Sequence, residues 1–155
     1  MKREIKFRGK DVENDNQWRY GSLIQYPNGD CVIVEFDKDG NELSYDVDPK
    51  TVGQYTGMKD GCGRDIYERD ILQLTIPDGS TRWLIAEWAE ENRKLMPLDG
   101  FEHDGNPIRI CGWCFKWNGY RLYPSVINGT PDNKRMIVVA NIFTLHDNGE
   151  LLCEK

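Results

Sequence analysis

Four carboxylates lie close together near the middle of the chain, where they could supply oxygen ligands to a divalent cation. Hard cations such as Mg²⁺ take oxygen ligands, so the residue types suit such a site. The spacing matches no EF-hand loop, however, and no nucleotide-binding motif accompanies it. The favoured interpretation is a solvated acidic turn, with no bound metal and no cofactor. The four residues are Asp60, Asp65, Glu68 and Asp70.

A CxxC sequence, Cys111-Gly112-Trp113-Cys114, could act in redox chemistry or bind zinc. Redox pairs of this kind commonly depend on a helix N-terminus, whereas this one falls in an alternating run that predicts a strand. Residues i and i+3 of a regular strand point to opposite faces, so the two thiols should not meet. Zinc needs further ligands, and Cys31, Cys62 and His103 are not spaced to supply them. No nucleophile motif accompanies His103 or His146, so we expect no catalytic residue.

A row of aromatic side chains follows one face of the same predicted strand and continues after a turn. Aromatic rows with interleaved basic residues can stack single-stranded bases. Exposed Trp, Tyr and Arg also anchor protein partners, and aromatics equally suit the inner face of a sheet. The inner-face interpretation is favoured, and both binding interpretations stay open. The candidate binding surface consists of Arg109, Trp113, Phe115, Trp117, Tyr120, Arg121 and Tyr123.

Length and charge bound these possibilities. The chain has 155 residues and a formal net charge of −6, which gives no surplus of positive charge for non-specific binding to duplex nucleic acid. Its five cysteines are an odd number, which argues against a full disulfide framework. No apolar run approaches the roughly 20 residues of a membrane helix. The first residues also lack the apolar core of a secretory signal. We therefore expect a cytoplasmic protein that does not enter the membrane.

Short alternating runs separated by turn residues predict a chain built from β-strands. Asn118-Gly119 is the preferred pair for a type I′ turn and predicts the clearest hairpin. Asp48-Pro49 suits the start of a short helical turn. The nearly unbroken apolar start of the last strand predicts burial on both faces. Strands are expected at 5–8, 18–26, 31–36, 43–47, 71–76, 82–88, 95–98, 108–117, 120–123 and 136–145. A helix is expected at 89–94, and loops are expected at 99–107 and 125–134.

These elements predict a mainly β protein of about nine or ten short antiparallel strands with little helix. We expect a single domain over residues 1–155, with an N-terminal β lobe over 1–57 and a C-terminal lobe over 64–155. The second lobe is expected to form a small, SH3-like barrel. The boundary between the lobes would fall between Gly57 and Gly63.

The segment from Val52 to Ile71, called here the signature segment, carries the densest pattern in the chain. It contains Gln54-Tyr55-Thr56-Gly57, then Lys59-Asp60 and Gly63, and ends with Ile66-Tyr67-Glu68-Arg69-Asp70-Ile71. Together with Arg3-Glu4-Ile5-Lys6-Phe7-Arg8 before it and Ala140-Asn141-Ile142-Phe143 after it, this pattern resembles the YopX family, small proteins of phages and prophages. The residues that carry the resemblance are Gln54, Tyr55, Thr56, Gly57, Asp60, Gly63, Ile66, Tyr67, Glu68, Asp70 and Asn141.

The signature segment has a physical interpretation apart from the resemblance. Asp60-Gly61-Cys62-Gly63 predicts a tight turn, because glycine tolerates left-handed backbone angles. Asp70 stands just before an apolar strand and should accept hydrogen bonds from turn amides. The chain departs from the family pattern at Arg69 and Ala140, where glycine is usual, and at Phe143, where tyrosine is usual. At Arg69 the chain therefore cannot use a positive φ at low cost, as it could with glycine.

The resemblance implies no catalytic residue. We expect a non-enzymatic phage or prophage accessory protein that acts in the cytoplasm of a bacterial host by binding. Its partner would be an unidentified host or phage protein, and the chain could also form a homo-oligomer through exposed sheet edges or an aromatic patch. One alternative is binding of single-stranded nucleic acid through the aromatic hairpin. The other, with the least support, is an enzyme that uses carboxylate or thiol chemistry.

Overall fold

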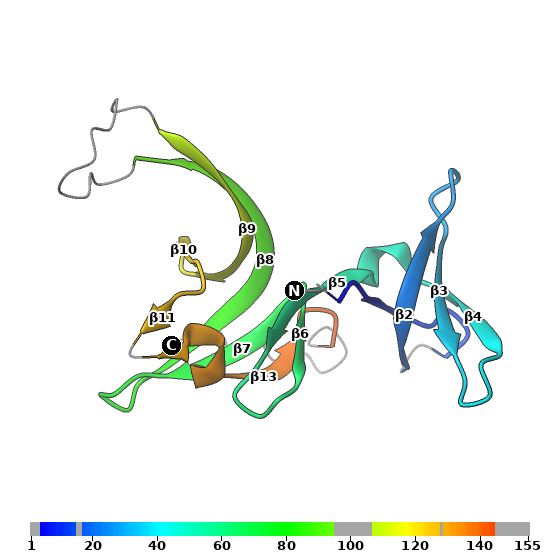
Figure 1. Ribbon diagram of the computed structural model, residues 1–155, viewed down its shortest axis with the longest axis horizontal. Helices are drawn as coiled ribbons and strands as arrows, with labels where there is room; N and C mark the ends of the chain where they lie inside the picture. Colours follow the sequence, from blue (N-terminus) through cyan, green and yellow to red (C-terminus); the bar gives the residue numbers. More distant parts are fainter. Residues whose placement is uncertain (1–3, 15–16, 95–106, 128, 145–155) are drawn as a thin grey trace.

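The computed structural model describes residues 4–14, 17–94, 107–127 and 129–144, which form antiparallel β-sheets with two short 3₁₀ turns (Figure 1). This confirms the predicted mainly β class. The first sheet has the order β4-β3-β2-β1-β5-β6. Its strands are β1 (Phe7–Lys10), β2 (Trp18–Gln25), β3 (Cys31–Phe36), β4 (Glu42–Val47), β5 (Gly53–Lys59) and β6 (Asp65–Tyr67). Stretch 57–63, the expected lobe boundary, thus lies in β5 and the turn that leads to β6.

The second sheet has the order β10-β9-β8-β7-β13. Its strands are β7 (Asp70–Thr75), β8 (Thr81–Arg93), β9 (Ile108–Trp117), β10 (Tyr120–Leu122) and β13 (Met136–Asn141). Its outer strands, β10 and β13, do not pair with each other, so the sheet stays open and the predicted SH3-like barrel is wrong. The reason is the length of β8 and β9, which pair over nine positions and continue past their neighbours as an arched ribbon (Figure 1).

The ribbon also replaces the helix expected at 89–94. Residues 89–93 extend β8, and they pair with β9 from Ala89↔Gly112 to Arg93↔Ile108. A helix of six residues has little stability of its own, whereas pairing with β9 supplies the hydrogen bonds of a regular ladder. The strand expected at 95–98 and most of the loop expected at 99–107 lie outside the described residues.

Three other differences concern short or outer strands. The signature segment forms β5 and β6, which the alternation pattern did not indicate. The stretch expected as a loop at 125–134 contains β11 (Val126–Ile127), β12 (Thr130–Pro131) and the 3₁₀ turn η2 (Asp132–Arg135). Strand β13 is an edge strand, so Ile137 and Val139 remain 40% and 43% exposed, and burial on both faces is wrong.

Local turn chemistry follows the predictions. The 3₁₀ turn η1 (Pro49–Thr51) begins after Asp48, whose carboxylate accepts a hydrogen bond from the Lys50 amide at 3.0 Å. Asn118 and Gly119 both have positive φ, at 45° and 80°, as a type I′ turn requires. No helical segment within the described ranges is long and apolar enough to span a membrane.

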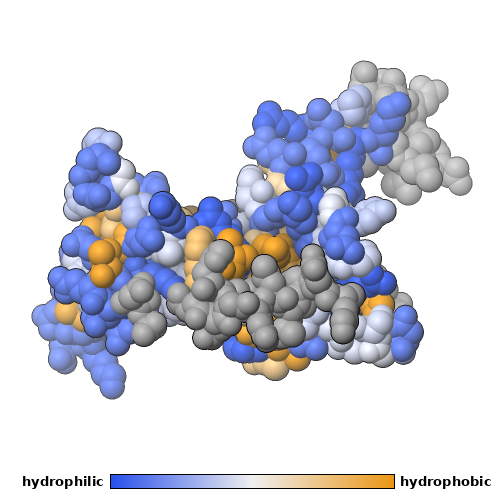
Figure 2. Space-filling model, turned by 180° about the vertical axis from the view of Figure 1, so that it is seen from behind, coloured by the Kyte–Doolittle hydropathy of each residue, from blue (hydrophilic) through white to orange (hydrophobic). Residues whose placement is uncertain are grey.

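Two hydrophobic cores lie against the two sheets. The core of the second sheet consists of Leu72, Leu84, Ala86, Phe115 and Met136, together with Ile66 from β6 of the first sheet. The core of the first consists of Cys31, Ile33 and Val47, with Phe7, Leu23 and Val52 packed against it. Seen from behind, hydrophobic side chains gather over the first sheet and in the middle of the molecule, whereas the arched ribbon is largely hydrophilic (Figure 2).

Truncation of Phe115 tests the second core. Phe115 is fully buried, so Phe115→Ala should lower the free energy of unfolding by about 3–5 kcal/mol through lost burial and an unfilled cavity. Tyr120, the first residue of β10, is 72% exposed. Tyr120→Ala should therefore change the free energy of unfolding by no more than about 0.5 kcal/mol. Urea unfolding followed by circular dichroism measures both. Similar losses in the two variants would contradict this core assignment.

Candidate functional site

The carboxylate of Asp60 fixes the turn of the β5–β6 hairpin and attaches it to the second sheet. The side chain is fully buried and accepts hydrogen bonds from the amides of Cys62 and Arg64, at 2.8 and 2.9 Å. It also accepts one at 2.9 Å from the amide of Val138 in β13. A solvated acidic turn is therefore wrong for Asp60. Beside it, the Gly61 amide donates to the Met136 carbonyl, and a Cβ at Gly61 would lie 2.8 Å from the Lys134 carbonyl oxygen.

The ionised form of Asp60 suits this environment. Burial acts to raise the pKa of its carboxyl group, but the amides of Val138, Arg64 and Cys62 all donate to the carboxylate and the net pKa is lowered. Hydrogen bonds to the charged form of an acid stabilise that form. Asp60 therefore contributes stability as an anion.

Asp70 forms a second connection, between β1, β6, β7 and β13. It is 1% exposed, and its carboxylate accepts hydrogen bonds from Arg8 Nη2 at 2.5 Å and the Tyr67 amide at 2.8 Å, with the Asn141 side-chain amide at 3.4 Å. The bond from the Tyr67 amide is the turn contact predicted for Asp70. Burial raises the pKa of the Asp70 carboxyl, while the Arg8 guanidinium acts to lower it. Arg8 lies over the rings of Trp18 and Tyr67, at 4.6 and 4.8 Å from their centres.

The remaining signature residues contact the chain itself. Thr56 donates its hydroxyl hydrogen to the Ile66 carbonyl at 2.8 Å, and Ile66 is fully buried in the core. Tyr55 and Tyr67 pack with ring centres 5.6 Å apart. The backbones of Gln54 and Glu68 are joined by a hydrogen bond, and Gly57 and Gly63 both have φ of 84°. Burial raises the pKa of the Tyr67 phenol to about 12, so it stays neutral at physiological pH.

The four signature carboxylates do not converge. Asp60 and Asp70 each occupy their own buried network, while Asp65 accepts hydrogen bonds from both Lys6 and Lys59 at 2.6 Å. Within the part of the chain that the structure describes, no group of three His, Cys, Asp or Glu residues is placed to hold a metal ion.

The cysteines are also separated. Cys111 is exposed and Cys114 is fully buried, which agrees with the prediction that they occupy opposite faces of the strand. Burial raises the pKa of the Cys114 thiol, which disfavours the reactive thiolate. Cys31 is a free thiol within the first core, and Cys62 is free and exposed. His103 and His146 lie outside the described residues.

The predicted aromatic surface is divided by depth and by face. On one face of β9, Phe115 is in the core, and Trp117 packs against that core with the Arg82 guanidinium 4.0 Å from its ring centre. Tyr120 stacks on Trp117, with centres 6.0 Å apart. Trp113 meets Trp88 edge to face at 5.4 Å, and Trp88 is 46% exposed. Trp88 was not part of the aromatic surface predicted from the sequence. Its place opposite Trp113 follows from the pairing register of β8 and β9 in the structure.

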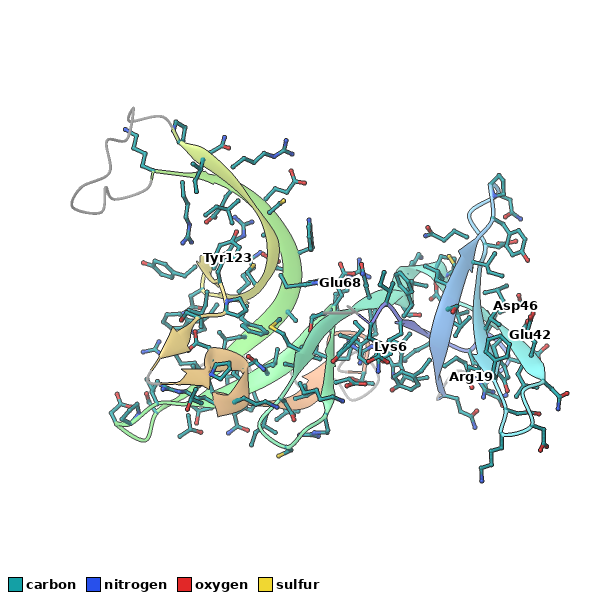
Figure 3. The ribbon with its side chains drawn as sticks, in the orientation of Figure 1. Lys6, Arg19, Glu42, Asp46, Glu68 and Tyr123 are labelled. Atoms are coloured by element: carbon teal, nitrogen blue, oxygen red, sulfur yellow. The ribbon has the colours of Figure 1, made fainter. Side chains whose placement is uncertain are left out.

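The charged members of that surface have partners on β8. Arg109 pairs with Glu90, while Arg121 contacts Glu87 at 3.2 Å and Glu91 at 3.5 Å. Arg121 pairs in register with Lys116, so it projects from the face opposite Trp117. Tyr123 lies under the Arg93 guanidinium, on the concave side of the ribbon (Figure 3).

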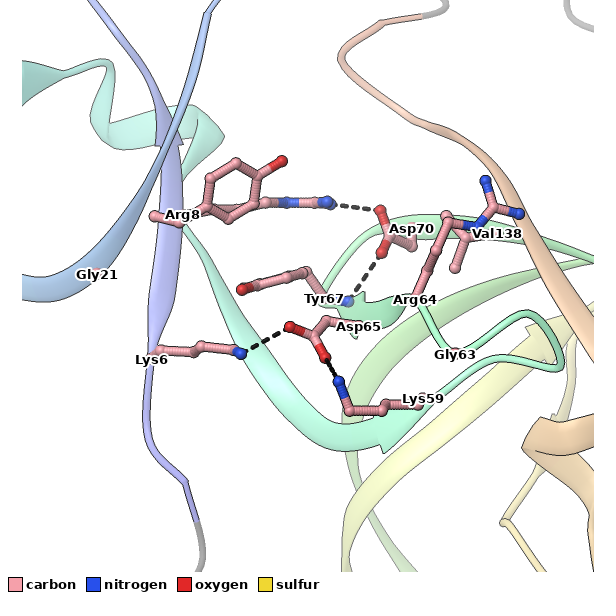
Figure 4. A pocket seen from close by; sticks show the side chains of 11 residues that line it. Lys6, Arg8, Gly21, Lys59, Gly63, Arg64, Asp65, Tyr67, Asp70 and Val138 are labelled. Carbon is pink, nitrogen blue, oxygen red and sulfur yellow. Dashed lines mark hydrogen bonds and ion pairs between the residues drawn. The ribbon is translucent and has the colours of Figure 1, made fainter. Parts of the chain in front are cut away.

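A groove between the two sheets is a further candidate site. It has a volume of about 590 Å³ and is lined by residues of β1, β2, the β5–β6 hairpin, β7 and β13. Figure 4 shows Lys6 and Arg8 on one side, with Arg64 and Val138 across from them and Asp65, Tyr67 and Asp70 between. Sequence reasoning missed this groove, because its basic residues come from separate segments.

The YopX protein family model matches residues 6–108, about two thirds of the chain. The chain belongs to the YopX family. No curated protein matches it. In this YopX-family protein the match includes β1, the signature segment, the ribbon strand β8 and the residues Arg8, Asp60 and Asp70, but not their partners Val138 and Asn141. Residues 109–155, with nearly all of β9, the hairpin turn and Asn141, lie outside the match.

Arg69 shows how this chain accommodates a residue other than glycine in the signature segment. Its φ is 66°, so Arg69 adopts the left-handed backbone that is costly for a residue other than glycine. Its guanidinium donates to the Lys50 carbonyl at 2.7 Å and lies over the Phe143 ring at 5.4 Å. These contacts offset part of the cost of a left-handed backbone, which is about 1–2 kcal/mol for a residue with a Cβ.

Two substitutions at Arg69 separate these effects. Arg69→Ala and Arg69→Gly both remove the side-chain contacts, but only alanine keeps the strained backbone. The glycine variant should therefore be more stable than the alanine variant by about 1 kcal/mol in urea unfolding. Equal stability, or a more stable alanine variant, would show that the left-handed conformation costs nothing at this position.

Asp60→Asn should destabilise the protein by about 1–3 kcal/mol at neutral pH, because a neutral amide leaves buried donors unsatisfied. The lowered pKa of Asp60 gives this effect a pH dependence. Its stabilising contribution is present above the pKa of about 3.9 in the unfolded chain and is lost as pH falls through the folded value. The stability difference from wild type should thus shrink between pH 7 and about pH 3, as measured by urea unfolding. A constant difference would contradict the role of the charge.

Proposed function

We propose that this YopX-family protein acts by binding another protein, through the outer part of the β8–β9 ribbon. The observation that carries the proposal is the Trp88–Trp113 pair, which stands on the ribbon with Trp88 46% exposed. Large, partly exposed aromatic side chains on a fixed backbone are favoured anchors of protein interfaces. A tryptophan held edge to face by a neighbour loses little further conformational freedom when a partner covers it.

The edges of the ribbon supply a second means of recognition. Strand β7 pairs with β8 only between Thr81 and Ile85, and β10 pairs with β9 only between Phe115 and Trp117. Beyond those positions, no described strand pairs with the outer edge of residues 87–93 or 108–114. Unpaired strand edges accept further strands, and their backbone groups then provide affinity. A partner could thus add a strand beside the tryptophan pair.

The charge arrangement favours a protein over single-stranded nucleic acid. Glu87, Glu90 and Glu91 project from β8, and they pair with the arginines that would otherwise contact phosphates. Phosphate binding needs cations available for neutralisation, and nearby carboxylates oppose it. We further propose that the protein is a non-enzymatic phage or prophage accessory protein of the bacterial cytoplasm. The family membership supports that assignment.

Capture from bacterial host lysate tests the proposal, with variants that separate the ribbon from the rest. Trp88→Ala should reduce capture of the partner at least about tenfold, since an anchor residue is worth 1.4 kcal/mol or more. Tyr120→Ala, which removes an exposed aromatic outside the free part of the ribbon, should capture it normally. Size-exclusion chromatography shows whether that partner is a second copy of this chain.

Two results would overturn this function. One is equal capture of the same partner by wild type and Trp88→Ala. The other is salt-sensitive binding to short single strands at micromolar protein that Trp88→Ala abolishes, which would assign the ribbon to nucleic acid instead.

A further inference from the structure

The groove between the sheets continues into a second hollow. The first has a volume of about 590 Å³ and the second about 460 Å³. Five residues contribute to the lining of both hollows: Arg8, Tyr20, Arg64, Asp70 and Val138. The hollows thus meet at two arginines, a tyrosine, a valine and the Asp70 carboxylate, which is the partner of Arg8. Their volumes fall in the range typical of small-molecule sites.

The lining of the groove carries an excess of positive charge, although the chain as a whole is acidic. Four cations line the first hollow, against the two carboxylates of Asp65 and Asp70. Lys6 and Lys59 share Asp65 as an ion-pair partner (Figure 4), and Lys6 also pairs with Glu4, which lies outside the lining, at 3.0 Å. Asp60 lies beneath Arg64 with no exposed surface, and amide hydrogen bonds already surround its carboxylate.

Arg8 has hydrogen-bonding capacity that the described residues do not use. It is 7% exposed, and its bonds to Asp70 and to the Glu68 carbonyl both come from Nη2. Its Nε is buried without a hydrogen-bond partner. A buried, unsatisfied donor costs free energy unless an acceptor or a water molecule reaches the group. The guanidinium lines both hollows, so an acceptor bound where they meet would face it.

Arg64 approaches the same place from the other side. Its side chain is 55% exposed, and Nε is the atom that donates to Asp60, at 3.1 Å. The terminal nitrogens of a guanidinium form a planar fork that matches the oxygens of a phosphate. Tyr20 is 46% exposed and meets Tyr67 edge to face, so its ring offers a surface on which a flat group can pack.

We propose that the groove binds a nucleotide, with its phosphate between Arg8 and Arg64 and its base beside Tyr20. The two guanidiniums supply charge and direction, and Lys6 and Lys59 extend the positive field along the first hollow. The aromatic wall supplies contact area for the ring. This site is separate from the tryptophan pair of the ribbon, so it adds a ligand to the proposed protein partner and does not depend on it.

Calorimetric titration of the full chain with adenosine monophosphate, adenosine and inorganic phosphate tests the two halves of this site. The monophosphate should bind saturably and lose affinity as salt is raised, because salt screens partly exposed charges. Adenosine and inorganic phosphate should each bind at least about tenfold more weakly, since each makes only part of the contacts.

Arg64→Ala should weaken binding of the monophosphate at least about tenfold. Arg109→Ala is the matched control, because it removes the same charge from an exposed arginine on the ribbon. It should leave the affinity unchanged, as should Trp88→Ala, which tests the proposed function separately. If Arg64→Ala fails to fold by circular dichroism, Arg64→Lys keeps the charge but removes the fork, and it should still weaken binding.

The proposal fails if adenosine monophosphate does not bind at millimolar concentration in low salt. It also fails if Arg64→Ala and Arg109→Ala weaken binding equally, since that would indicate a general charge effect. If inorganic phosphate binds as tightly as the nucleotide, the base contact at Tyr20 is wrong. If adenosine binds as tightly as the nucleotide, the phosphate contact at the arginines is wrong.

Discussion

The buried ion pair between Arg8 and Asp70 is the contact on which the arrangement of the two sheets depends. Arg8 belongs to the first sheet and Asp70 begins the second, and both side chains are almost fully removed from water. Loss of one partner from a buried pair leaves an uncompensated charge and costs about 3–5 kcal/mol. The rings around Arg8 and the Asn141 amide beside Asp70 hold the two groups in place. Relative movement of the sheets would therefore separate charges in a medium that cannot replace their partners.

The density of the signature segment follows from this constraint. The segment has to form the β5–β6 hairpin, bring the Asp60 carboxylate to β13 and start β7 with Asp70 in reach of Arg8. Each task restricts residue type: a carboxylate that accepts several amides, a glycine where a Cβ would meet the Lys134 carbonyl, and an aromatic ring against a guanidinium. The segment therefore works as a connection between sheets. The groove is the space that this connection leaves open.

The sequence allowed prediction of features that depend on neighbouring residues. Alternation located most strands, Asn118-Gly119 located the hairpin turn, and Asp48 located the 3₁₀ turn. Features that depend on distant pairing were not predictable in this way. Residues 89–93 join β8 only because β9 lies beside them, and the second sheet stays open because β8 and β9 continue past their neighbours. Arg69 takes a positive φ because Lys50 and Phe143, from other parts of the chain, hold its side chain.

The same distinction applies to the candidate sites. The aromatic row was visible in the alternation of Trp113, Phe115 and Trp117, but alternation gives the face of a side chain and not its depth. Depth depends on where the core ends, which leaves Phe115 inside and Trp113 beside an exposed Trp88. The groove depends on pairing between distant segments, since Lys6, Arg8, Lys59 and Arg64 come together only when β1 pairs with β5 and β5 pairs with β6. Asp70 and Val138 from the second sheet complete its lining. A projecting ribbon suits a large partner that approaches from outside, whereas a hollow between sheets suits a small ligand that they enclose. The two proposed sites therefore differ in kind, because the ribbon extends beyond the second hydrophobic core and the groove lies between the two sheets.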